Sequence, residues 1–249
     1  MKFFYLMMVL VTTFYASPEE VKKVDHVANA VPKTMSVENK KKRFYHLLVP
    51  IVDKVYSELM EQYVSVSDDI EEGKNPKKIA QLKKLYNVKS DSELLRALKP
   101  HPQSIVLAQA ALESAWGTSR FFREANNVFG MWSKNKNEKR IAANIKRKGN
   151  QTIWLRKFDS LEDSVRAYYF LLAKAKAFKD FRVVRYDTDD VHQMVQKLHK
   201  YSEIGQNYTK ALSKMIKHNE LTKYDYQYKY NAENAVAFTK NLDQLYNLE

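Results

Sequence analysis

Apolar residues recur every three or four positions along most of the chain, which is the spacing of amphipathic α-helices. The first periodic stretch begins near Lys41 and predicts a helix of about twenty residues, in which Pro50 should introduce a kink. Its apolar positions are Phe44, Leu47, Leu48, Ile51, Val55, Leu59 and Tyr63. The densely charged segment at 67–78 predicts a break after this helix.

Three shorter helices are expected next. Periodic stretches at about 76–86 and 91–98 predict two of them, and Ser90 and Asp91 are cap candidates for the second. The third has Pro102 in its first turn and Gly117 positioned to end it. Its apolar residues are Ile105, Ala108, Leu112 and Ala115.

Alternating polar and apolar residues replace the helical period within residues 133–158. The runs RIAANIKR and QTIWLRKF flank a KGN turn that contains Gly149, so they predict a short β-hairpin. Seven positive residues lie between Lys134 and Lys148, against the single negative Glu138. Two interpretations of this basic face stay open: a solvated edge that lysines protect against self-association, and a surface that binds an anionic partner.

A further helix follows the hairpin. Asp159 or Ser160 can cap it, with Glu162 or Asp163 at its third position. Its apolar stripe consists of Val165, Tyr168, Tyr169, Leu172 and Ala173. We expect the two adjacent tyrosines of this stripe to lie in the core.

Composition and the amino terminus favour an exported, helical protein. The chain has 249 residues, of which 45% are hydrophobic and only five are glycine. Residues 3–15 form an apolar run of about thirteen positions, shorter than the roughly twenty that span a bilayer, which is typical of a secretory signal peptide. An uncleaved interfacial anchor is the alternative, because Phe14 stands where a cleavage site needs a small residue.

The formal net charge is +13, and removing residues 1–16 takes away only Lys2 and leaves +12. Such a charge is common in nucleic-acid-binding proteins, but the basic residues are spread over the whole length and form no recognised nucleic-acid motif. An anionic surface outside the cytoplasm attracts the same charge, and the leader favours that partner. The chain has no cysteine, which is compatible with either redox compartment.

Glu113 is the first candidate for chemistry, because it falls in the last turn of the helix that begins at Pro102. The negative end of the helix dipole lies there, and Leu112, Trp116 and Trp132 could desolvate the carboxyl group. Both effects raise a carboxyl pKa, and a carboxyl that stays protonated near neutral pH can act as a general acid. The competing interpretation is an ordinary solvated surface charge.

Two runs around this residue, ALESAWGTSRF and NNVFGMW, resemble the signature of the Bax-like branch of the flagellar-type N-acetylglucosaminidases, which cut peptidoglycan glycan strands. The resemblance covers roughly residues 41–225 and implies that Glu113 is the catalytic acid. It also places the NN-x-FG run at the substrate cleft. The residues expected to bind substrate are Trp116, Asn126, Asn127, Phe129, Gly130 and Trp132.

A third run, YSEIGQNY, matches the family pattern at Tyr201, Gly205 and Tyr208. The resemblance implies a tyrosine beside the catalytic acid, and we assign this place to Tyr201. Its phenol could hydrogen-bond the sugar acetamido group or orient the acid, and a half-buried packing role is equally compatible with the sequence. Tyr208 is expected to pack.

The chain departs from the family in its second carboxylate. Glycosidases normally use two, and many relatives carry a second glutamate in the hairpin, where this chain has no acid. Glu138 lies just before that window, and Asp159 and Glu162 lie after it. The alternative is substrate-assisted cleavage, in which the acetamido group of the sugar supplies the nucleophile.

The sequence therefore predicts a mainly α, lysozyme-like fold with a small β-hairpin lobe and an added N-terminal helical section. The expected segments are a signal peptide or anchor at 1–16, a linker at 17–42, the N-terminal helical section at 43–98, a glucosaminidase-like catalytic domain at 99–221 and a tail at 222–249.

The expected activity is that of an endo-β-N-acetylglucosaminidase acting on peptidoglycan in the periplasm or cell envelope, with no cofactor or metal and no nucleic-acid partner. His192 and His199 have no nearby third ligand for zinc. A lytic transglycosylase and a catalytically silent glycan-binding wall protein are the alternatives. If the protein acts on the wall, the basic hairpin could hold the anionic peptide stems of the wall.

Overall fold

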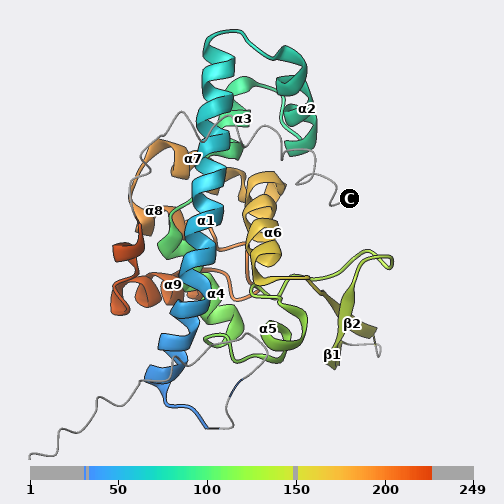
Figure 1. The fold of residues 1–249 in the computed structure, drawn as a ribbon, viewed down its shortest axis with the longest axis vertical. Helices are drawn as coiled ribbons and strands as arrows, with labels where there is room; N and C mark the ends of the chain where they lie inside the picture. The colour runs from blue at the N-terminus through green and yellow to red at the C-terminus, as the bar shows by residue number, and fades with distance from the viewer. Residues whose placement is uncertain (1–30, 32–33, 148–150, 226–249) are drawn as a thin grey trace, which may run out of the picture.

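The computed structural model describes residue 31 and residues 34–147 and 151–225. In this part of the chain, helices surround two hydrophobic cores, and one antiparallel hairpin extends from them (Figure 1). The helices are α1 (Val37–Glu71), α2 (Pro76–Tyr86), α3 (Asp91–Leu98), α4 (Gln103–Ser114), α5 (Arg120–Ala125), α6 (Leu161–Lys174), α7 (Lys179–Asp187), α8 (Val191–Gln196) and α9 (Gln206–His218), with 3₁₀ turns η1 (Lys176–Phe178) and η2 (Leu221–Tyr224). The strands are β1 (Arg140–Arg147) and β2 (Gln151–Arg156). The mainly α fold class with a small hairpin is confirmed.

Helix α1 is longer than the sequence pattern predicts. It begins at Val37, inside the expected linker, where the Ser36 side chain accepts a hydrogen bond from the backbone of Asn39. It ends at Glu71, so the expected break at 67–78 is partly wrong. Val66 is fully buried in a second core with residues of α2 and α3, and this packing keeps the charged end of α1 helical.

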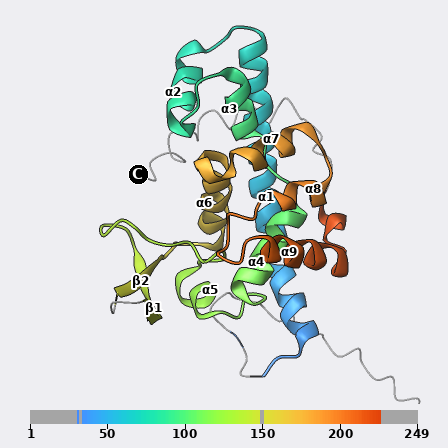
Figure 2. The same ribbon diagram turned by 180° about the vertical axis from the view of Figure 1, so that it is seen from behind.

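The two cores share α1 and α6 as a common frame. The larger core joins α1 to α4, α6, α8 and α9, and the smaller one joins the far end of α1 to α2, α3 and α6. Figures 1 and 2 show α2 and α3 at one end of α1, and α4, α5 and α9 toward its other end. The helical section before residue 99 is therefore packed against the helices that follow it.

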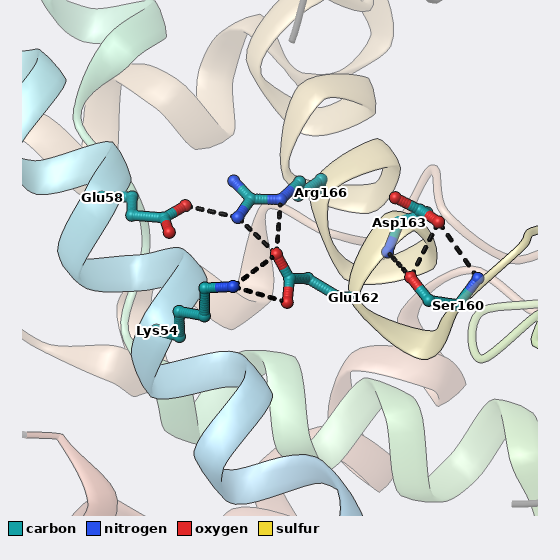
Figure 3. Close-up of polar contacts among 6 residues, drawn as sticks. All are labelled: Lys54, Glu58, Ser160, Glu162, Asp163 and Arg166. Atoms are coloured by element: carbon teal, nitrogen blue, oxygen red, sulfur yellow. Dashed lines mark hydrogen bonds and ion pairs between the residues drawn. The ribbon is translucent and has the colours of Figure 1, made fainter. Parts of the chain in front are cut away.

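The capping signals of Ser90 and Ser160 are confirmed, whereas α4 ends at Ser114 with Ala115 as its C-cap, before the expected Gly117. Helices α2 and α3 have the expected bounds, and the Ser90 side chain accepts from the backbone of Glu93. Ser160 begins α6 with a capping box, in which its hydroxyl and the Asp163 carboxylate each bind the backbone of the other residue (Figure 3). Each such cap contributes about 1 kcal/mol to helix stability.

The hairpin is confirmed as well, and it projects from the helical body (Figures 1 and 2). Arg140 pairs with Arg156 and Ala142 with Trp154, and an irregularity follows Ala142 on β1. Arg120 of α5 anchors the hairpin by donating to the backbone oxygen of Ala142, at 3.0 Å. Gly149 of the expected turn lies outside the described residues.

The leader and most of the tail also lie outside the described residues. The predictions of a signal peptide or anchor at 1–16 and of a tail after Asp225 therefore stay predictions. Among the helices that the structure describes, none combines the length and apolarity needed to cross a bilayer.

Candidate active site

Helix α4 places Glu113 in its last turn, as predicted, and ends one residue later at Ser114. The Ser114 hydroxyl donates to the Ala110 carbonyl and accepts from the Gly117 backbone at 2.8 Å. Ala115, Trp116 and Gly117 all have positive φ, at 50°, 60° and 70°. The left-handed conformation costs a non-glycine residue about 1–2 kcal/mol, so other contacts must hold this turn.

Helix α1 supplies those contacts. The guanidinium of Arg43, which is 2% exposed, donates to the Gly117 carbonyl at 3.1 Å. The Trp116 ring meets Phe44 edge-on, with ring centroids 5.3 Å apart, and meets Tyr45 at 5.8 Å. Trp116, which we expected to bind substrate, therefore packs against α1 and stabilises the strained turn behind Glu113.

The Glu113 carboxyl is partly buried and has one hydrogen-bond partner among the described residues. The Tyr208 hydroxyl donates to its Oε1 at 2.7 Å. Burial raises the pKa of Glu113 above its ordinary value, although the hydrogen bond from Tyr208 opposes this shift. The expected rise in pKa is thus confirmed, with desolvation as its largest cause.

Gly130 lies beside Oε2, the other oxygen of the Glu113 carboxyl. A Cβ atom placed on Gly130 would lie 3.8 Å from Oε2 of Glu113, and the φ of Gly130 is 63°. Glycine adopts this conformation without strain, so the loop can pass close to the acid. Trp132, two residues further on, is 49% exposed and forms a backbone bridge with Leu155 of β2. Its ring is available to solvent.

The side chains of the Asn-Asn-x-Phe part of the second motif make contacts within the protein. Asn126 donates to the carbonyls of Phe158 and Asp159, and Asn127 donates to those of Met131 and Arg156. These bonds tie the loop to β2 and to the start of α6. Asn127 is buried and its amide needs such internal partners, whereas Asn126 is only partly buried. That the two amides contact substrate stays a prediction.

Phe129 packs inside the protein. Its side chain is 2% exposed and stacks on Tyr168, with ring centroids 3.9 Å apart. The ring thus belongs to the core beneath the loop. Of the six residues expected to bind substrate, Gly130 and Trp132 have the positions best suited to contact it.

The two tyrosines of the third motif both lie near Glu113, and their hydroxyls bind different groups. Tyr208, expected to pack, holds the carboxyl of Glu113. Tyr201 donates to the Phe129 carbonyl at 3.2 Å and stacks on Tyr208, with ring centroids 5.6 Å apart. Gly205, with a φ of 55°, begins α9 and turns the first helical residues toward α4. Two tyrosines seven positions apart do not reveal this turn, so the spacing alone could not decide between them.

Three candidates for a second carboxylate form ion pairs with basic residues. Glu138 pairs with Arg156 at 3.0 Å, and Asp159 pairs with Lys139 at 2.6 Å. Glu162 accepts from Lys54 of α1 and from Arg166 of α6 (Figure 3). Burial acts to raise the Glu162 pKa, but these hydrogen bonds outweigh it and lower the pKa below its ordinary value.

Sequence comparison identifies the class of this protein. A glucosaminidase family model, described as mannosyl-glycoprotein endo-beta-N-acetylglucosaminidase, matches residues 92–221, which is more than half of the chain. The match makes the protein a glycoside hydrolase. It belongs to the glucosaminidase family, and the match includes Glu113, Gly130 and Tyr208.

Individual relatives agree with this assignment. The chain is 32% identical to Protein bax of Escherichia coli K12 over 133 residues, which cover 51% of this chain and 46% of that protein. It thus spans about half the length of that relative, and the resemblance to Bax-like proteins is confirmed.

Among solved structures, the chain is similar to a peptidoglycan hydrolase from Sphingomonas sp. A1, with 23% identity, 52% of this chain and 86% of that chain covered, and a TM-score of 0.41. It is also similar to the glycoside hydrolase domain of FlgJ from Salmonella typhimurium, with 20% identity, 68% and 99% covered, and a TM-score of 0.40.

Proposed function

We propose that the protein is an endo-β-N-acetylglucosaminidase that hydrolyses peptidoglycan glycan strands, with Glu113 as its general acid. The observation that carries this proposal is the desolvated Glu113 carboxyl, whose pKa is raised and whose Oε1 alone is held by Tyr208. A glycosidase acid must be protonated when substrate binds, and a raised pKa favours this protonated form. Oε2 lies beside the Gly130 loop, where it can face the glycosidic oxygen.

In this mechanism, Glu113 transfers its proton to the leaving oxygen as the bond from that oxygen to the sugar C1 breaks. The carboxylate that forms keeps the hydrogen bond from Tyr208, which is worth more to a charged acceptor than to a neutral one. Burial raises the pKa of Tyr208 far above its usual range, so the phenol stays a neutral donor throughout. Glu113 and Tyr208 therefore act as one unit.

The nucleophile in this proposal is the acetamido oxygen of the substrate sugar, which attacks C1 on the face opposite the leaving group. Water then opens the cyclic intermediate, and Glu113 takes up the proton of that water. The ion pairs of Glu138, Asp159 and Glu162 support this version, because each of these carboxylates already has a cationic partner. Tyr201 lies next to Tyr208 and is proposed to shape the acetamido pocket through its ring.

The products formed from purified peptidoglycan test the proposed function. Mass spectrometry should find new reducing N-acetylglucosamine ends with the wild-type protein and none with Glu113→Gln. Anhydromuramic ends would show a lytic transglycosylase instead. The absence of any new ends, with binding retained, would show a catalytically silent glycan-binding protein.

We further propose that the protein acts in the cell envelope after export. The apolar run at residues 3–15 and the net charge of +13 support this location, since an anionic wall attracts a basic protein. Fractionation of cells that produce the untagged protein should recover it outside the cytoplasm. Recovery in the soluble cytoplasm would contradict both the location and the substrate.

A further inference from the structure

A line of hydrogen bonds runs through the core behind Glu113 and connects it to His101. Four side chains form this buried relay. They are His101, which lies two residues before α4, Gln109 of α4, Tyr168 of α6 and Tyr208 of α9. None of the four is more than 4% exposed. Because these side chains are buried, their hydroxyl and amide groups depend on partners within the relay.

The hydrogens of the relay all point toward Glu113. Gln109 donates from its amide nitrogen to the Tyr208 hydroxyl at 2.9 Å and accepts from the Tyr168 hydroxyl at its amide oxygen. Since the Tyr208 oxygen already accepts from Gln109, its own proton is directed to Oε1 of Glu113. The orientation of the Gln109 amide thus decides where the phenol proton goes.

His101 sets the direction at the far end. Its Nε2 lies 3.2 Å from the Tyr168 hydroxyl, and its Nδ1 has no partner among the described residues. Burial, and then the charge of Arg185, hold the pKa of His101 well below its ordinary value, so the ring is neutral and carries one proton. That proton belongs on Nε2, where an acceptor exists.

Reversal of the relay would be costly at both ends. If the Gln109 amide turned over, Tyr208 would donate to its oxygen, and Glu113 would lose a hydrogen bond. Tyr168 would then have to donate to Nε2 of His101, which would move the ring proton to the unpartnered Nδ1. A buried N–H without an acceptor costs about 1–3 kcal/mol.

We propose that Gln109 is a positioning residue that, fixed by Tyr168 and His101, keeps the Tyr208 hydroxyl as a donor to Oε1 of Glu113. Oε2 is then the oxygen that carries the acid proton, on the side of Gly130. The proposal rests on the proposed function of Glu113 as the acid. It adds three residues behind the site that act only through Tyr208.

The titratable groups around the relay are few. Those that face Glu113 are Tyr201 and Tyr208, and those that face His101 are Tyr168, Tyr169 and Arg185. Arg185 of α7 lies at the His101 end and donates to carbonyls of α3. A shift of the Glu113 pKa in a Tyr-to-Phe variant of the relay would therefore act through hydrogen bonds, because such a substitution leaves every formal charge in place.

Two adjacent tyrosines of α6 offer a matched test. Tyr168→Phe keeps the ring that stacks on Phe129 and removes the donor to Gln109, whereas Tyr169→Phe removes a hydroxyl that donates to the His101 backbone carbonyl at 3.3 Å. Both changes remove one buried hydroxyl. Only Tyr168→Phe frees the Gln109 amide to turn.

The relay predicts that Tyr168→Phe lowers kcat about three- to tenfold with KM unchanged, the effect of one lost hydrogen bond. The high-pH limb of kcat/KM should move to higher pH, because the bond from Tyr208 is what lowers the Glu113 pKa. Tyr169→Phe should leave the limb in place. If neither variant moves it, or both move it equally, the relay only supports the core and the proposal is wrong.

Gln109→Glu provides a stronger test at the centre of the relay. A carboxyl at this position offers oxygens to both tyrosines, so Tyr208 can donate to it instead of to Glu113. We expect kcat to fall more than about tenfold and the high-pH limb to move further than in Tyr168→Phe, because the introduced carboxylate also raises the Glu113 pKa through its negative charge. An unchanged limb in a folded Gln109→Glu protein would overturn the proposal.

A titration without substrate separates this proposal from the proposed function. Carbon-13 NMR of labelled glutamate, assigned with Glu113→Gln, should show a higher Glu113 pKa in Tyr168→Phe than in the wild type and in Tyr169→Phe. If Glu113→Gln retains glycosidase activity, the proposed function fails whatever this titration shows. If the three titrations coincide, the relay proposal fails while the acid role of Glu113 stands.

Discussion

Glu113 and Glu162 are both partly buried glutamates, one at the C-terminal end of a helix and the other at the N-terminal end of another helix. Glu113 lies in the last turn of α4 and faces a phenol, whereas Glu162 lies in the first turn of α6 and faces Lys54 and Arg166. The pKa of the first is raised by burial, and in the second the cationic partners outweigh burial and lower it. The same side chain can thus be an acid or a permanent anion, depending on whether its partners carry charge.

The comparison explains how the chain can work with one catalytic carboxyl. Around Glu113 the protein provides burial without a cationic partner among the described residues, and this burial raises the pKa of the carboxyl. Around Glu162 it joins α1 to α6 through an ion-pair cluster that also includes Glu58 (Figure 3). This second arrangement stabilises the frame on which the two cores are built.

The largest predicted effect comes from replacing glutamate by glutamine, in separate variants, at positions 113 and 162. Glu113→Gln should lower activity by about two to four orders of magnitude while the fold survives, because it removes the proton donor and keeps the shape. Glu162→Gln should retain activity and lose stability, since it leaves Lys54 and Arg166 without their carboxylate. Hydrolysis rates and thermal unfolding of both variants check this. A Glu113→Gln protein with more than a tenth of wild-type activity would refute the acid assignment.

The second-largest effect is expected from removing the Tyr208 hydroxyl, which donates a hydrogen bond to Glu113. Tyr208→Phe should lower kcat about tenfold and move the high-pH limb upward, because removal of the hydrogen bond lets the Glu113 pKa rise further. Activity needs the protonated acid and is lost as pH rises through this pKa, so the sign is an extension to higher pH. Tyr201→Phe is the control, since its hydroxyl binds a backbone carbonyl. An equal shift in both variants would mean that Tyr208 has no special place.

A smaller effect is expected from the remaining acids near the hairpin and α9. Glu138→Gln, Asp159→Asn and Glu203→Gln should each change kcat by less than about threefold if the substrate supplies the nucleophile. The rates of the three variants on peptidoglycan are the measurement. Should one of them match the loss at Glu113, a two-carboxylate mechanism is restored with that residue as the partner.

The smallest effect is expected for binding through the basic hairpin. Glu113→Gln protein should bind purified sacculi less tightly as salt rises, since ions screen surface charge over about 8–10 Å at ordinary ionic strength. Replacing Lys146, Arg147 and Lys148 together by glutamine should flatten this dependence. An unchanged salt slope would leave the hairpin as an ordinary solvated edge.

Local signals predicted much of the fold. Ser90 and Ser160 begin α3 and α6 as their sequence context indicates, and the alternating runs pair as a hairpin. The extent of α1 was not predictable in this way, because its charged end is helical through Val66, which packs against residues far along the chain. Long-range burial overrode a local pattern there.

The site was predicted less completely than the fold. The sequence predicts Glu113 as the acid from its place at a helix end and from the motif around it, and the structure places it in that last turn. The contacts of Asn127 were not predicted, since its amide meets carbonyls of Met131 and Arg156 that only the folded loop brings together. The role of Gln109 could not be predicted from the sequence. It depends on hydrogen bonds with Tyr168 and Tyr208, which lie about sixty and a hundred residues away in the sequence.

Direct titration of Glu113 tests the central claim, that burial against neutral partners makes this carboxyl the acid. Carbon-13 NMR of the wild-type protein with labelled glutamate, with the resonance assigned by its loss in Glu113→Gln, reports the pKa of this one group. The account predicts a value above the ordinary range of glutamate, while Glu162 titrates below it. A Glu113 pKa at or below the ordinary range would contradict the account.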